Sequence, residues 1–138
     1  MDVGFIGVGG IAGNYLNSLE RIADVRVSAV CDIDATRAGS VAERFGSRTY
    51  DDHHAMFEAE RLDALFIAVP PFAHTDQEIL AAKRGIPMFI AKPVAMDLDT
   101  VNAALAAIRE HEVMTGVGYM WRHSDLTDKA RELLGERA

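Results

Sequence analysis

The chain has 138 residues, a length that suits one domain, and 49% of them are apolar against 25% charged. This balance is typical of a globular domain and excludes a disordered chain. A single cysteine excludes an internal disulfide framework, and the net charge of −7 argues against a basic face that binds nucleic acid.

Short apolar runs rich in β-branched residues alternate with longer stretches of helical periodicity, which is typical of βαβ units. We expect strands at residues 3–8, 25–31, 48–50, 64–69, 88–91 and 113–119. We expect helices at residues 11–23, 35–45, 52–58, 75–84, 98–111 and 125–134. The pattern predicts an α/β fold in three layers, a Rossmann-type doubly wound parallel sheet of about six strands in the order 3-2-1-4-5-6.

A glycine-rich loop, GVGGIAG, follows the first expected strand and opens the first expected helix. Gly7, Gly9 and Ala12 fit the pattern G-x-G-x-x-A. The first glycine allows a sharp turn, the second lets a pyrophosphate approach the backbone, and the small third residue lets the helix pack closely. The N–H groups and dipole of the helix N-terminus then favour the phosphates. We expect dinucleotide contacts from Gly7, Gly9, Gly10 and Ile11.

An acidic residue stands at the distance that a ribose contact requires. Asp32 ends the second expected strand, about 20 residues after Ala12. A turn that merely reverses the chain is the alternative interpretation of the loop, and the acid at this spacing favours the dinucleotide. Because a carboxylate repels a 2′-phosphate, we expect NAD. NADP stays open, since Asp34 also fits a simple helix cap and Arg37 lies one turn into that helix, within reach of a phosphate.

Three more distinctive segments follow the fourth, fifth and sixth expected strands. They read PPFAH, AKP and YMWR, at residues 70–74, 91–93 and 119–122. Ligands of open parallel sheets bind beyond the carboxyl ends of the strands, where the glycine loop also lies. We therefore expect all these segments to surround one site.

Together, these segments resemble the N-terminal domain of the Gfo/Idh/MocA oxidoreductases, the family of glucose–fructose oxidoreductase and inositol dehydrogenase. The resemblance covers essentially the whole chain, and the Lys92-Pro93 pair, combined with the other motifs, is its specific part. It implies an NAD(P)-dependent enzyme that transfers hydride between the nicotinamide and a sugar, cyclitol or related hydroxyl compound. It also implies residues 1–122 as the dinucleotide-binding domain and residues 123–138 as a helix leading toward a C-terminal substrate domain absent from this chain.

The resemblance also implies roles for individual residues. Lys92 is the catalytic residue, which polarises the reacting hydroxyl or takes part in its proton transfer. Pro70 and His74 lie around the nicotinamide end, and Arg122 lies near the cofactor. The family usually has glutamate where this chain has Ala91, so Lys92 lacks a neighbouring acid. A plain strand end is the other interpretation of Lys92, and His74 fits a local partner at a helix start equally well.

Several further expectations complete this interpretation. The Lys92–Pro93 peptide bond should be cis, and Cys31 reads as a small strand residue and not a nucleophile. The pair His53-His54 shows no spacing of metal ligands and reads as a solvated loop pair, so we expect no metal. Alone, the chain should bind the cofactor but turn over little, because a closed, dry site requires the partner domain. In full length we expect a homo-oligomer.

A second function stays open beside the enzyme. The chain would then be a stand-alone, non-catalytic dinucleotide sensor or dimerisation module. In this interpretation Ala91 marks the loss of catalytic activity, and apolar residues near the C-terminus dock onto another copy of the chain. A reading frame that continues past Ala138 into a second α/β domain favours the enzyme. The apolar run at residues 64–72 is far shorter than a membrane requires, and an acid follows Met1, so we expect a cytoplasmic protein without membrane or nucleic-acid partners.

Overall fold

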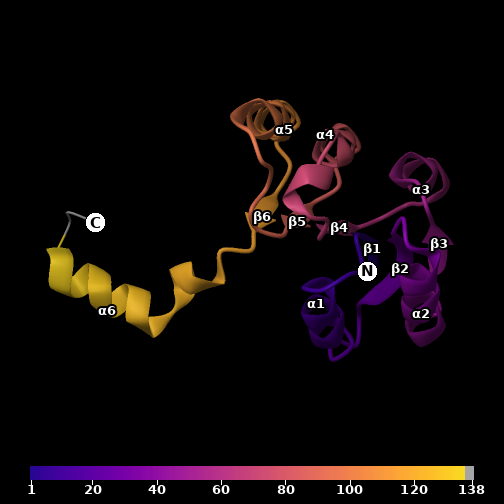
Figure 1. Cartoon of the computed structure of the whole chain (residues 1–138), viewed down its shortest axis with the longest axis horizontal. Helices are drawn as coiled ribbons and strands as arrows, with labels where there is room; N and C mark the ends of the chain where they lie inside the picture. Colours follow the sequence, from indigo (N-terminus) through magenta and orange to yellow (C-terminus); the bar gives the residue numbers. More distant parts are fainter. Residues whose placement is uncertain (136–138) are drawn as a thin grey trace.

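The computed structural model describes residues 1–135. A parallel sheet of six strands, in the order β3-β2-β1-β4-β5-β6, carries helices on both faces (Figure 1). This confirms the predicted Rossmann architecture and strand order. The strands are β1 (Asp2–Ile6), β2 (Arg26–Cys31), β3 (Arg48–Tyr50), β4 (Ala64–Ile67), β5 (Met88–Ile90) and β6 (Thr115–Val117).

The helices lie close to the predicted positions. They are α1 (Ala12–Leu19), α2 (Ala35–Phe45), α3 (His53–Ala59), α4 (Gln77–Lys83), α5 (Leu98–Glu110) and α6 (Asp125–Leu134), with short 3₁₀ turns η1 (Pro71–Ala73) and η2 (Met120–His123). The predicted range of α1 is too long, because after Leu19 the backbone N–H groups of Arg21 and Ile22 bond carbonyls three residues back and tighten the chain into turns. Within residues 1–135, no helix is long and apolar enough to cross a membrane.

The sheet is buried on both faces because its central strands are apolar on both sides. On one face Phe5 stacks on Phe66, with ring centroids 4.7 Å apart, and Leu16 of α1 packs in the same cluster. On the other face Ile67 and Met56 belong to a second cluster, which α4 also joins. Close packing on both faces holds the strands in register.

Parallel pairing brings the carboxyl ends of the strands to one edge of the sheet. The N–H of Gly7 donates to the Cys31 carbonyl at 2.8 Å, and the N–H of Ala68 donates to the Ile6 carbonyl at 2.8 Å. On the next strand the N–H of Ala91 donates to the Ile67 carbonyl at 2.8 Å. These bonds extend the ladders by one residue and fix where the loops of the site begin.

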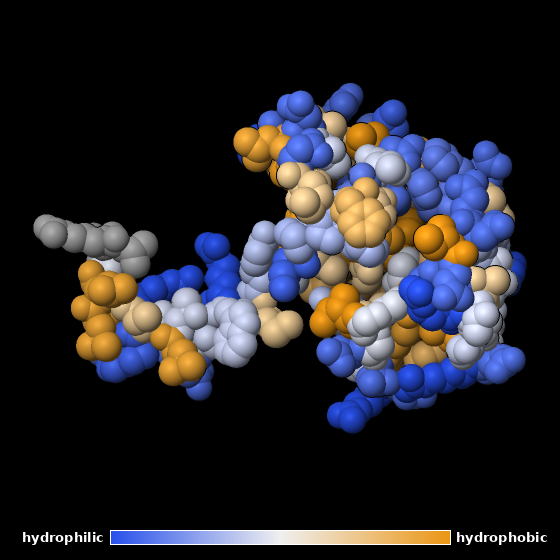
Figure 2. All heavy atoms as spheres, viewed as in Figure 1, coloured by the Kyte–Doolittle hydropathy of each residue, from blue (hydrophilic) through white to orange (hydrophobic). Residues whose placement is uncertain are grey.

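The last helix, α6, lies away from the sheet and is joined to it through η2 (Figure 1). Leu126, Leu133 and Leu134 are exposed on it, and Figure 2 shows the hydrophobic atoms of this segment on the surface. The helix expected over residues 123–138 is thus present from Asp125 to Leu134. The remainder of that prediction, residues 136–138, falls outside the described residues.

Candidate functional site

A cavity of about 490 Å³ opens at the carboxyl ends of β1, β2, β4 and β5. Its wall is built from the loops that leave these strands, so residues far apart in sequence meet there. Seven of the predicted site residues line it: Gly7, Gly9, Gly10, Ile11, Asp32, Pro70 and Lys92. The predicted convergence is therefore observed for the segments after these four strands, whereas residues 119–122, after β6, do not line the cavity.

The glycine loop fits a phosphate group. Gly7 has φ +82°, and a Cβ added to it would lie 2.8 Å from the carbonyl of Ala68, so only glycine suits this turn. At Gly10 an added Cβ would meet no atom within 4 Å, which leaves the backbone bare toward solvent. Ile11, at the N-cap of α1, supplies no side-chain cap, so the helix N-terminus is left for an anionic ligand.

Asp32 is buried at the end of β2 and ties the loops together. Its Oδ2 accepts the N–H of Val8 at 2.9 Å, and its Oδ1 accepts the N–H of Asp34 at 2.9 Å. Each carboxylate oxygen has two acceptor positions, so Asp32 can still accept hydrogen bonds from ribose hydroxyls. Asp34 caps α2, as its simpler interpretation predicts, and binds the guanidinium of Arg37 at 3.0 Å. The same guanidinium lies 3.7 Å from Asp32 Oδ1.

Lys92 lies directly after β5, at the far side of the cavity from Asp32. Its side chain is exposed, and the Lys92–Pro93 peptide bond is cis, as predicted. Ala91 is buried and lines the cavity. The chain therefore offers an exposed ammonium group here without a carboxylate on the preceding residue.

Cys31 also lines the cavity, as a buried residue of β2. Burial, reinforced by the carboxylates of Asp52, Asp32 and Asp51, raises the pKa of the Cys31 thiol to about 12. A thiol with this pKa stays protonated at neutral pH, and only the thiolate is a good nucleophile. This confirms the interpretation of Cys31 as a structural strand residue.

Two predicted cofactor residues do not line the cavity. His74 is buried, with its Nδ1 2.5 Å from a carboxylate oxygen of Glu78, and its Nε2 has no hydrogen-bond partner in the described part of the chain. This buried pair turns the imidazole into the protein and not toward the cavity. Arg122 is exposed on η2, beyond β6. The assignment of both residues to the cofactor rests on the resemblance and stays a prediction.

Sequence reasoning also missed residues that line the cavity, among them Ile33, Asp51 and His53. All follow the ends of strands, so the rule that found the other segments could have found these. The interpretation of His53 and His54 as a solvated loop pair is wrong for His53, which begins α3 and is only 17% exposed. Asp76, at the N-cap of α4, lies 2.8 Å from His53 Nε2 and 3.3 Å from His54 Nε2.

Fold and site together define a dinucleotide-binding Rossmann domain: a glycine turn at the first strand, an acid at the end of the second and an open cavity between them. The model of the Gfo/Idh/MocA family, described as an oxidoreductase family with an NAD-binding Rossmann fold, matches residues 1–119. The chain belongs to this family and is its NAD-binding domain.

Similar proteins are dehydrogenases of sugars and cyclitols. Inositol 2-dehydrogenase of Rubrobacter xylanophilus is 35% identical over 127 residues, which cover 88% of this chain and 35% of that protein. D-xylose 1-dehydrogenase (NADP(+)) 2 of Haloferax volcanii is 28% identical, and the match covers 42% of the length of that protein. The crystal structure of myo-inositol 2-dehydrogenase from Lactobacillus plantarum matches with a TM-score of 0.86 and 26% identity, over 97% of this chain and 40% of that one. The chain thus spans 35–42% of the length of these proteins.

Proposed function

We propose that this chain is the cofactor-binding part of an NAD-dependent dehydrogenase that acts on a CH–OH group of a sugar or cyclitol. The observation that carries the proposal is the meeting of the Gly7 turn, Asp32 and Lys92 at one cavity. The names of the relatives support the substrate class, since they include inositol and xylose dehydrogenases. Bound NAD would accept the hydride from the substrate carbon.

Different residues of the cavity would bind different parts of the cofactor. The bare backbone at Gly10, the neighbouring Gly9 beside the Arg37 guanidinium, and the N-terminus of α1 would hold the pyrophosphate. Asp32 would accept hydrogen bonds from the hydroxyls of the adenosine ribose. Its negative charge opposes a 2′-phosphate, and the Arg37 guanidinium is already paired with Asp34 at 3.0 Å. The charge of Asp32 supports NAD, whereas the exposed Arg37 guanidinium at the cavity leaves NADP open.

Lys92 would act on the substrate oxygen. Its ammonium can donate a hydrogen bond to the reacting hydroxyl and stabilise the negative charge that develops as the proton leaves. The exposure of the side chain at the cavity rim supports this role, because a substrate can reach it. The preceding residue, Ala91, has no carboxylate that could compete for the ammonium.

The division of the chain into residues 1–122 as cofactor domain and a following segment that leads to a substrate domain is part of the same proposal. Two observations support it. The relatives are more than twice as long as this chain, and α6 carries exposed leucines away from the sheet (Figure 1). A helix with such a face is typical of one that packs on further structure.

Hydride transfer can be tested in the complete protein that carries this domain, with NADH absorbance as the readout and inositols, glucose and xylose as substrates. Lys92→Met should lower kcat by about 10²–10⁴-fold while the Kd for NAD⁺ stays close to that of the wild type. Lys83→Met, which removes an exposed lysine at the end of α4, is the matched control. A kcat of Lys92→Met equal to that of the control would contradict the assignment.

A further inference from the structure

Two histidines and an aspartate meet beside the cofactor cavity, at the start of α3 and the start of α4. We propose that His53, His54 and Asp76 bind one divalent transition-metal ion of the zinc class, with Asp52 as the residue that orients the ring of His53. The site is separate from the hydride-transfer chemistry assigned to Lys92. We expect the bound ion to link α3 to α4 at the cavity wall.

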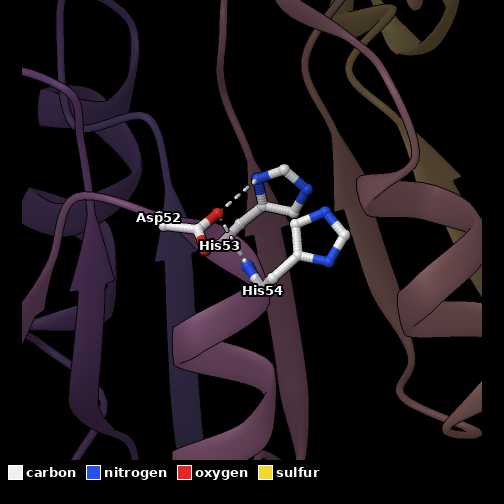
Figure 3. Close-up of side chains that lie close together, drawn as sticks. All are labelled: Asp52, His53 and His54. Carbon is white, nitrogen blue, oxygen red and sulfur yellow. Dashed lines mark hydrogen bonds and ion pairs between the residues drawn. The ribbon is translucent and has the colours of Figure 1, made fainter.

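Both imidazoles face the Asp76 carboxylate, and ligand atoms of Asp52, His53 and His54 lie within 4.8 Å of one another. His53 Nε2 lies 2.8 Å from Asp76 Oδ1, and His54 Nε2 lies 3.3 Å from Asp76 Oδ2. The two rings have centroids 4.4 Å apart, and Figure 3 shows them side by side. Ligands at about 2.0–2.2 Å from a tetrahedral zinc ion are about 3.3–3.6 Å from one another. Side-chain rotations that bring the two histidine nitrogens to this separation beside Asp76 would let all three residues hold one ion.

Asp52 is placed to support this geometry without ligating the ion. Its Oδ1 lies 3.8 Å from His53 Nδ1, the ring nitrogen opposite the one that faces Asp76. The same carboxylate accepts the backbone N–H groups of His54 at 3.1 Å and Ala55 at 3.3 Å, which fixes it as the cap of α3. A carboxylate that holds one imidazole nitrogen while the other binds metal is a recurrent arrangement in zinc sites.

The charge and accessibility of the cluster suit a cation. The Asp76 carboxylate lies against both imidazoles and gives the cluster a negatively charged oxygen ligand. The exposed fractions of the three side chains, 17% for His53, 39% for Asp76 and 52% for His54, leave the site open to solvent ions.

The donor set selects the class of ion. Two imidazole nitrogens and one carboxylate suit zinc and its neighbours in the transition series, whereas magnesium and calcium prefer oxygen ligands throughout. Since His53 also lines the cofactor cavity, the ion would lie at the cavity wall.

Calorimetric titration of the metal-free chain with zinc chloride near neutral pH tests the proposal. We expect saturable binding of one ion per chain, no such binding of magnesium chloride, and an affinity at least tenfold lower in His54→Asn and in Asp76→Asn. His111→Asn is the control, because it removes an exposed imidazole at the end of α5 and should leave the affinity unchanged. His54 is half-exposed, so its replacement should leave the fold intact, which the circular dichroism spectrum checks.

A second readout is independent of calorimetry. An ion that binds only the folded chain raises its melting temperature, by about 5–10 °C when zinc is 100-fold above its Kd. The rise should be absent in His54→Asn and present in His111→Asn. Zinc affinity in His54→Asn and Asp76→Asn equal to that in His111→Asn, or no saturable binding by the wild type, would overturn the proposal.

Discussion

Replacing Gly7 with alanine should destabilise the fold by about 2–5 kcal/mol. Two costs add. Gly7 has φ +82°, a left-handed conformation that costs a residue with a Cβ about 1–2 kcal/mol. The new methyl would also lie 2.8 Å from the carbonyl carbon and oxygen of Ala68 and from the nitrogen of Val69. Backbone atoms cannot rotate aside, so this overpacking adds roughly 1–3 kcal/mol.

Two other glycines separate these costs. Gly46, the C-cap of α2, has φ +70° but no atom within 4 Å of an added Cβ, so Gly46→Ala should lose about 1–2 kcal/mol from conformation alone. Gly39, inside α2, has ordinary helical backbone and open space around an added Cβ. Gly39→Ala should therefore stabilise the chain by about 0.5–1 kcal/mol, through the better helix propensity of alanine.

Urea unfolding followed by circular dichroism measures all three variants against the wild type. The expected order of stability is Gly39→Ala, wild type, Gly46→Ala and then Gly7→Ala, with similar m values throughout. A Gly7→Ala variant as stable as Gly46→Ala would refute the close approach of the loop to the backbone after β4. The requirement for glycine at Gly7 would then be conformational only.

Three more outcomes follow from the surroundings of single side chains. Cys31, whose pKa is raised to about 12, should react with iodoacetamide at about pH 8 only in urea, and stoichiometric labelling of the folded chain, measured by mass, would contradict its burial. Asp97 caps α5, and its hydrogen bond from the Thr100 N–H holds the pKa below the ordinary 3.8. The stabilisation that the ionised Asp97 side chain gives is therefore full above that pH and is lost as the pH falls below it. The difference in urea midpoint between the wild type and Asp97→Ala should shrink on acidification. A constant difference would show that the charge of Asp97 does not contribute to stability. Glu60 is buried and accepts the Tyr50 hydroxyl at 2.5 Å, so Glu60→Ala should cost about 2 kcal/mol in the same assay, and a loss below 0.5 kcal/mol would show the bond to be dispensable.

The fold could be predicted from the sequence because its signals are local and mutually consistent. Alternating strand and helix periods imply parallel strands with right-handed crossovers, which leaves few topologies. The ends of elements are harder to predict. The strand predicted over residues 3–8 runs into the glycine loop, whereas β1 ends at Ile6. The end of α1 after Leu19 depends on turns that the apolar pattern does not reveal.

In the site, too, features that depend on neighbouring residues could be predicted from the sequence, and contacts between distant residues could not. The glycine loop and Asp32 have fixed spacings, so the sequence predicts them directly. The contact between His53 and Asp76 joins residues 23 apart, and only the packing of α3 beside α4 brings them together. His74 and Glu78 are four residues apart, a spacing that could have suggested their pairing and the burial of His74.

Binding of NAD⁺ to the chain tests the central claim most directly. Calorimetric titrations with NAD⁺ and NADP⁺ should show tighter binding of NAD⁺ by the wild type. In Asp32→Asn, which keeps an acceptor oxygen but removes the charge, the affinity for NAD⁺ should fall by about 10–100-fold and the preference should move toward NADP⁺.

Asp99→Asn removes one carboxylate from the first turn of α5 and should bind as the wild type does. NAD⁺ affinity in Asp32→Asn equal to that of the Asp99→Asn control would contradict the assignment of Asp32 to the ribose. A folded wild-type chain that binds neither cofactor would contradict the whole account of the cavity.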